Sequence, residues 1–194
     1  MNKTIILILT ILITSASYAQ RFDGLIVFGM TATQVDGDGM GSYNKIGGTL
    51  GLFVTHRITD KIEFQTGLDY TGKGARNGFD SYYFFKTQLD YIQIPVQFSY
   101  KVFEKIGLTG GLRFGYLMNA YNISGGLRTD ENQLEMLNFE PSAYASLDYY
   151  IFGKIVLNFG FSYSVFPVKM GGSTWWFNNM LTVTGTYRFS NAKD

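Results

Sequence analysis

Residues 62–73 read IEFQTGLDYTGK and alternate between two kinds of side chain. One parity is mainly apolar and the other is polar or glycine: Ile62, Phe64, Thr66, Leu68 and Tyr70 against Glu63, Gln65, Gly67, Asp69, Thr71 and Lys73. Residues 155–166 repeat this separation. Successive side chains of a β-strand point to opposite faces, so both stretches are predicted to be strands with one apolar and one polar face.

The same alternation predicts eight strands along the chain. They cover residues 22–33, 46–58, 62–73, 87–102, 105–118, 137–151, 154–166 and 175–189. Tight turns alternate with longer loops rich in Gly, Asn, Asp and Ser, such as residues 119–136. An even number of strands with short turns at one end and long loops at the other is typical of outer-membrane barrels. We therefore expect residues 20–194 to form one all-β domain, an eight-stranded antiparallel up-and-down transmembrane β-barrel.

Strand length and aromatic placement favour the membrane. The strands are longer than the about five or six residues usual in globular proteins and suit a tilted bilayer crossing of about 9–11 residues. Aromatic residues gather at the long-loop ends: Tyr70, Tyr82, Tyr83, Phe84, Phe85, Tyr116, Trp175 and Trp176. Others gather at the short-turn ends: Phe22, Tyr100, Phe103, Tyr149, Tyr150, Phe152, Tyr187 and Phe189. We expect these two sets to mark the two membrane interfaces.

Alternation alone does not say which face points outward. A soluble, lipocalin-like ligand-binding barrel with an apolar interior has the same period. The strand length, the aromatic strand ends and the scarcity of charge on one parity favour the membrane barrel over this alternative.

The composition excludes several other classes of protein. Hydrophobic residues make up 46% of the chain, aromatic residues 17% and charged residues only 16%. The chain has no cysteine, which excludes a disulfide scaffold and a cysteine-based metal site. A net charge of +1 provides no basic field for nucleic acid.

The N-terminal segment predicts export. Lys3 precedes the largely apolar residues 5–13, and residues 17–19 offer a small-x-small cleavage site. This pattern is typical of a secretory signal peptide covering residues 1–19, cut after Ala19. We expect the exported protein to reside in the cell outer membrane.

One strand carries a more specific signal. Residues 89–100 read LDYIQIPVQFSY and resemble the Y-x-[ED]-I-P-x-x-x-K-Y strand of PorT-like outer-membrane β-barrel proteins. Gln93 stands where that family commonly has an acid, and Ser99 where it commonly has a lysine. Further stretches that resemble the family are residues 51–53, 68–74, 110–117 and 187–189. The resemblance implies an eight-stranded barrel in the envelope of a Gram-negative cell; some members serve a secretion and gliding apparatus, and no functional residues carry over.

The inward parity carries the charged residues of the predicted strands: Arg57, Glu63, Asp69, Lys73, Lys101, Arg113, Glu140, Asp148 and Arg188. The interior of an eight-stranded barrel is just wide enough to be filled by side chains. Buried charges there must pair, because each unpaired charge has a high desolvation cost. We expect a salt-bridge network that fills the lumen; a small-ion or proton path through it is the alternative.

Candidate catalytic and metal-binding residues are few. His56 is the one histidine, and its place near a short turn, with outward parity, argues against an enzyme that modifies outer-leaflet lipid. Asp36 and Asp38 begin like a calcium loop, but the further ligands of that motif do not follow. Pro95 and Pro141 each lack a ladder donor and are expected to cause local bulges.

No catalytic, cofactor-binding or metal-binding residues are therefore expected. The predicted role is structural or partner-binding, in contact with outer-membrane lipid. Envelope or secretion-complex proteins, or surface ligands recognised by the outer loops, are the expected partners.

Overall fold

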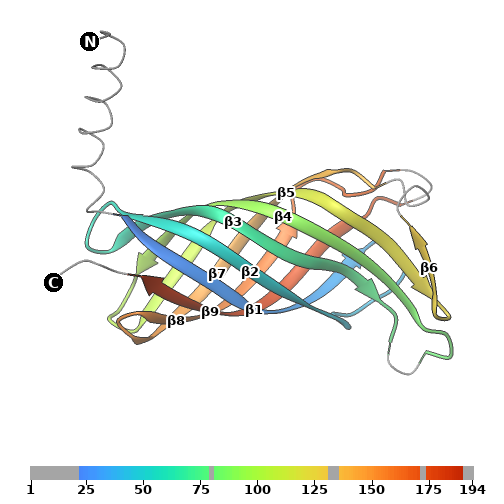
Figure 1. Cartoon of the computed structure of the whole chain (residues 1–194), viewed down its shortest axis with the longest axis horizontal. Helices are drawn as coiled ribbons and strands as arrows, with labels where there is room; N and C mark the ends of the chain where they lie inside the picture. Colours follow the sequence, from blue (N-terminus) through green and yellow to red (C-terminus); the bar gives the residue numbers. More distant parts are fainter. Residues whose placement is uncertain (1–21, 79–80, 131–135, 171–173, 190–194) are drawn as a thin grey trace, which may run out of the picture.

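The computed structural model describes residues 22–78, 81–130, 136–170 and 174–189, which form a closed, elongated barrel (Figure 1). The predicted signal peptide lies outside these described residues. The strands are β1 Phe22–Asp36, β2 Lys45–Arg57, β3 Ile62–Arg76, β4 Phe85–Lys101, β5 Ile106–Ser124, β6 Leu127–Asp130, β7 Phe139–Phe152, β8 Ile155–Ser164 and β9 Phe177–Phe189. No helix in this part of the chain is long and apolar enough to span a membrane.

Eight of these strands close the barrel. All pairings are antiparallel, in the order β4-β3-β2-β1-β9-β8-β7-β5, and β4 pairs with β5 to complete the circle. The first and last barrel strands pair from Gly24 with Phe189 to Asp36 with Phe177. This pairing confirms the predicted eight-stranded antiparallel barrel.

The two faces of the strands have opposite polarity. On the outside, Met30, Leu52 and Leu68 are each more than half exposed, whereas inward-facing Thr31 and Gln93 are fully buried. An apolar exterior around a polar interior is the arrangement of a membrane barrel. The soluble barrel with an apolar interior is therefore wrong.

The connections between strands differ in length at the two ends of the barrel. The start of β1 and the end of β9 lie at the end with the short turns, and the long connections lie at the opposite end (Figure 1). In outer-membrane barrels the short turns face the periplasm. We call the two ends the periplasmic end and the outer end accordingly.

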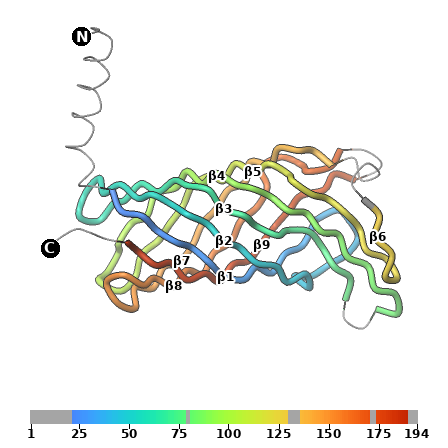
Figure 2. The backbone as a smooth tube through the Cα atoms, in the orientation of Figure 1, coloured from blue at the N-terminus to red at the C-terminus, as the bar shows by residue number. Residues whose placement is uncertain are grey.

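The expected loop at residues 119–136 is wrong in its first half. β5 continues to Ser124, and β6 returns beside it through a two-residue turn at Gly125 and Gly126 (Figure 2). Both glycines have positive φ, 55° and 86°, which is the backbone geometry that a tight hairpin turn requires. The sequence did not reveal this hairpin because the strand periodicity of β5 changes near its outer end.

The expected bulges at the prolines are also wrong. β3 and β4 keep one register on both sides of Pro95, although the pairs around it are missing from the ladder. An antiparallel strand directs each N–H to one neighbour only, so the missing donor of a proline interrupts one ladder without shifting it. The register shifts lie instead between Asp90 and Tyr91 and between Tyr150 and Phe152.

Candidate functional site

A buried ion pair occupies the middle of the lumen. Lys73 Nζ on β3 donates to Glu140 Oε1 on β7 at 2.6 Å, and both side chains are at most 1% exposed. Asn178 on β9 donates to the other carboxylate oxygen of Glu140 at 2.8 Å. The ring of Tyr91 lies 5.2 Å from Lys73 Nζ. Side chains of β3, β4, β7 and β9 therefore meet across the barrel.

Gln93 connects this ion pair to a second one. In the amide orientation that satisfies both neighbours, its oxygen accepts from Lys73 Nζ at 3.0 Å and its nitrogen donates to Asp69 Oδ1 at 3.2 Å. Asp69 also lies 3.6 Å from Arg113 Nη1, and the Arg113 guanidinium lies 3.6 Å from the centre of the Tyr144 ring. A glutamine can serve both a cation and an anion here because it carries a donor and an acceptor.

Asp148 has a different environment. It is 2% exposed and accepts hydrogen bonds from Thr109 Oγ1 at 2.5 Å, Ser146 Oγ at 2.8 Å and Asn158 Nδ2 at 2.8 Å. Of the described residues, none forms an ion pair with it. Neutral donors stabilise this carboxylate in place of a cation.

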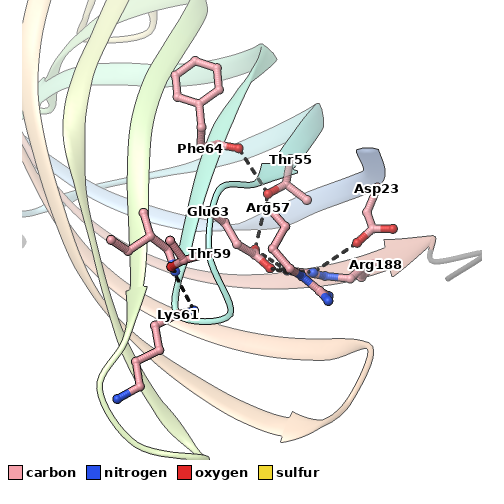
Figure 3. Close-up of polar contacts among 9 residues, drawn as sticks. Asp23, Thr55, Arg57, Thr59, Lys61, Glu63, Phe64 and Arg188 are labelled. Carbon is pink, nitrogen blue, oxygen red and sulfur yellow. Dashed lines mark hydrogen bonds and ion pairs between the residues drawn. The ribbon is translucent and has the colours of Figure 1, made fainter. Parts of the chain in front are cut away.

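A third charged group lies at the periplasmic end (Figure 3). Arg188 on β9 donates to both carboxylate oxygens of Glu63, at 2.9 and 2.6 Å, and to Asp23 Oδ2 at 3.2 Å. Thr55 Oγ1 donates to Glu63 at 3.3 Å. Such a two-pronged arginine–carboxylate pair fixes orientation as well as charge, and it joins the first, third and last strands of the barrel.

Two of the predicted lumen charges lie at the rim instead. Arg57 has a side chain that is 55% exposed and lies 4.0 Å from Glu63, and Lys101 is exposed with its Nζ 5.5 Å from the Tyr150 ring. Both have inward parity, but each is the last residue of its strand. Water at the open mouth of the barrel hydrates both side chains. The prediction that Arg57 and Lys101 lie in the buried lumen is therefore wrong.

Apolar side chains pack together inside the outer part of the lumen, which the sequence did not reveal. Val35, Leu89, Tyr91 and Leu117 are at most 3% exposed and belong to one cluster. Trp176 packs against it, together with Met40 and Met136. Because Trp176 covers this cluster and Tyr150 lines the opposite mouth, these two aromatic residues turn inward rather than toward lipid.

The comparison with protein families agrees with this architecture. The family described as "Outer membrane protein beta-barrel domain" matches residues 19–169. The chain belongs to this family. An outer-membrane barrel of this kind has a lipid-facing exterior, and the outer membrane is its location.

Solved structures show the same fold for this outer-membrane barrel. Ail, the attachment invasion locus protein of Yersinia pestis, solved in complex with the heparin analogue sucrose octasulfate, is 16% identical with a TM-score of 0.55 over 87% of this chain and 99% of Ail. Neisserial surface protein A is 14% identical with a TM-score of 0.56 over 86% of this chain and 97% of its own. No curated protein matches the chain.

The outer end of this outer-membrane barrel carries exposed aromatic residues on a built support. Tyr82 and Tyr83 are 93% and 73% exposed, and their rings lie 5.1 Å apart. Asn77 accepts from Phe85 N at 3.1 Å and donates to Tyr83 O, which braces the β3–β4 loop. The turn of the β5–β6 hairpin is attached to the same loop, because Gly125 N donates to Phe84 O at 3.1 Å.

Two candidate residues remain outside any reactive arrangement. The His56 ring lies 4.7 Å from the Phe22 ring at the periplasmic end, and no hydroxyl or carboxylate of the described residues hydrogen-bonds to it. In the loop after β1, Asp38 Oδ1 accepts from Met40 N at 2.7 Å. Burial, and to a smaller extent the nearby Asp36 charge, raise the pKa of Asp38 to about 6, although its backbone hydrogen bonds oppose the shift.

Proposed function

We propose that this outer-membrane barrel is a non-enzymatic protein that binds a partner at the cell surface through its outer end. The observation that carries the proposal is the group formed by residues 77–78 and 81–84 of the β3–β4 loop and by the β5–β6 hairpin, which we call the outer platform. Tyr82, Tyr83 and Leu127 on the outer platform are each more than 70% exposed. Large exposed apolar side chains on a braced support are typical of interaction sites.

The position of His56 supports a non-enzymatic role. A lipid-modifying enzyme of the outer leaflet needs a base beside a nucleophile at the outer end. His56 lies at the opposite end against Phe22. Lipid chemistry at the outer leaflet therefore has no histidine to act as its base.

The structure of the lumen argues against a channel role. The interior is occupied by the ion pairs around Lys73 and Asp69, and an apolar cluster that includes Leu89 covers it on the outer side. Eight-stranded barrels have interiors that side chains can fill. Binding at the surface accounts for the exposed outer platform, whereas conduction does not.

The comparisons suggest two kinds of partner. Ail shares the fold and was solved with a heparin analogue; we extend surface ligand binding, but not that ligand, to this chain. The resemblance of residues 89–100 to PorT-like proteins suggests association with a secretion-type complex of the envelope. In both versions the predicted signal peptide, residues 1–19, directs the chain to export.

Site-specific photo-crosslinking on intact cells tests the proposal. A photoreactive residue replaces Tyr82 or Leu127 on the outer platform, and in a matched control it replaces Phe103, which is also exposed but lies at the periplasmic end. We expect one discrete adduct from positions 82 and 127, with no such adduct from position 103, and we expect the Tyr82→Ser/Tyr83→Ser variant to abolish the adduct from position 127. Absence of an adduct at both platform positions, or the same adduct from position 103, would contradict surface binding by the outer platform.

A further inference from the structure

The periplasmic mouth opens into a cavity of about 480 Å³, which we call the periplasmic vestibule. The β2–β3, β4–β5 and β7–β8 turns surround it, and Arg188 on β9 contributes to its wall. This volume is within the usual range of ligand sites, about 300–1,000 Å³. The vestibule faces away from the outer platform and is not part of the proposed surface function.

The vestibule narrows sharply inside the barrel. Ser99, Tyr150, Val156 and Arg188 line both the vestibule and the next cavity along the lumen, which has only about 40 Å³. That space accommodates a few water molecules. A ligand therefore enters from the periplasm and stops near Arg188.

The charge of the vestibule is positive. Five basic and three acidic residues line it, and Glu63 is already paired with Arg188. The lysines at positions 61, 101 and 105 are all exposed, and none of them forms an ion pair with a carboxylate of the described residues. In Figure 3 the Lys61 side chain extends away from the Arg188–Glu63 pair. A concave surface with surplus charge of one sign concentrates ligands of the opposite sign.

The arrangement of the cations indicates the class of ligand. Both terminal nitrogens of Arg188 are occupied by Glu63 and Asp23, so the cations that face the open mouth are the exposed Arg57 and the three lysines. Lys61 and Lys105 lie on two different turns, and Lys101 ends β4 beside the Tyr150 ring. Separate point charges around an open mouth suit a chain that carries several spaced carboxylates.

We propose that the periplasmic vestibule binds an acidic peptide segment of a periplasmic partner protein. The carboxylates of the segment pair with Lys61, Lys101 and Lys105, and its aliphatic stems pack on Tyr150 and Phe152 of the vestibule wall. Because the outer platform takes no part, this proposal can fail while the proposed surface function stands, and the reverse also holds.

Peptide binding to the full chain in zwitterionic detergent tests the proposal. The probe is a fluorescently labelled tetraglutamate amide, its matched control is the tetraglutamine amide, and the readout is fluorescence anisotropy. We expect the tetraglutamate probe to bind and the tetraglutamine probe not to bind. The Lys101→Gln/Lys105→Gln variant should weaken binding about tenfold, as expected for the loss of two exposed ion pairs, and added salt should weaken it further.

The matched control variant is Lys154→Gln, because Lys154 is exposed on the β7–β8 turn but does not line the vestibule. It should leave the affinity unchanged. Heat-modifiable gel mobility of both variants checks that the barrel is folded. Equal binding of the two probes, equal weakening by Lys154→Gln, or displacement of the probe by an equimolar amount of inorganic phosphate would each overturn the proposal.

Discussion

Glu140 and Lys73 show how single residues organise the lumen. Glu140 receives Lys73 from one side of the barrel and Asn178 from another, so one carboxylate connects three strands. A buried ion pair is not by itself strongly stabilising, but removal of one partner leaves an uncompensated charge at a large cost. Specific residues in the lumen therefore depend on one another rather than contributing separately.

This dependence predicts the result of a double-mutant experiment. Lys73→Met should lower the free energy of unfolding by about 3–5 kcal/mol, and Lys73→Met/Glu140→Leu should recover most of this loss. Urea unfolding from lipid vesicles measures both values. Lys101→Gln, at an exposed rim position, serves as the control and should change stability by less than about 0.5 kcal/mol. Equal destabilisation by the single and double variants would contradict a coupled pair.

Asp38 predicts a local pH dependence at the outer end. Its pKa is raised to about 6, so the folded loop favours the protonated form and its order increases as the pH falls from above 6 to about 4. Hydrogen exchange of residues 37–44 measures this order. Asp38→Asn keeps an acceptor for Met40 N and should remove the pH dependence, with slow exchange at neutral pH. An unchanged pH profile in Asp38→Asn would assign the effect to another group.

At the scale of elements, β5 pairs with β4 along one edge and has two different partners along the other. On this edge, Ile106–Tyr116 pair with β7, whereas Tyr121–Ser124 pair with β6. The hairpin therefore extends the sheet beyond the closed barrel and supports the outer platform. Such an extension is held by fewer ladders than a barrel strand, so its stability depends strongly on its turn.

The turn gives a prediction for the hairpin. Gly126→Val places a β-branched residue at a φ of 86°, which costs on the order of 1–3 kcal/mol. We expect faster hydrogen exchange in the β5–β6 ladder, for example at Asn122, while exchange in the β5–β7 ladder remains slow. Gly153→Val is the matched control, because Gly153 has open space for a side chain and no positive φ. Equal effects of the two substitutions would argue against control by the turn.

At the scale of the whole molecule, the two ends of the lumen have different chemistry. Apolar side chains such as Leu89 and Val35 pack inside the outer part of the lumen, and the periplasmic end opens into a charged vestibule next to Arg188 and Lys101. The lumen therefore opens toward the periplasm and is filled by side chains toward its outer end. The two proposed binding surfaces, the outer platform and the vestibule, lie at opposite ends of the barrel.

A barrel whose lumen is filled by side chains should not conduct ions. We expect no discrete current steps from the purified barrel in planar bilayers, because the apolar cluster excludes hydrated ions and the ion pairs fill the middle of the lumen. The Phe103→Ser variant, altered outside the lumen, controls for incorporation artefacts. Steps that appear in the unaltered protein and change size in Arg113→Met/Glu140→Gln would favour an ion path through the network.

The sequence by itself determined the eight barrel strands and the polarity of their faces, but not the β5–β6 hairpin. These properties follow from a period of two along the strands, as in residues 62–73, whereas the membrane location was predicted from the strand length, the aromatic strand ends and the scarcity of charge on one parity. Inward parity also predicted Asp69, Arg113, Glu140 and Asp148 as lumen residues, and the structure buries all four side chains.

Only the tertiary structure decided which of those residues meet. Lys73 and Glu140 are 67 positions apart in the chain, and their contact depends on the stagger of strands around the closed barrel, which no local pattern records. The same stagger sets depth along the axis, so Arg57 and Lys101 reach water despite their inward parity while Trp176 covers the outer end. Parity reports the side of the wall on which a residue lies, and the closed barrel alone sets its height and its partners.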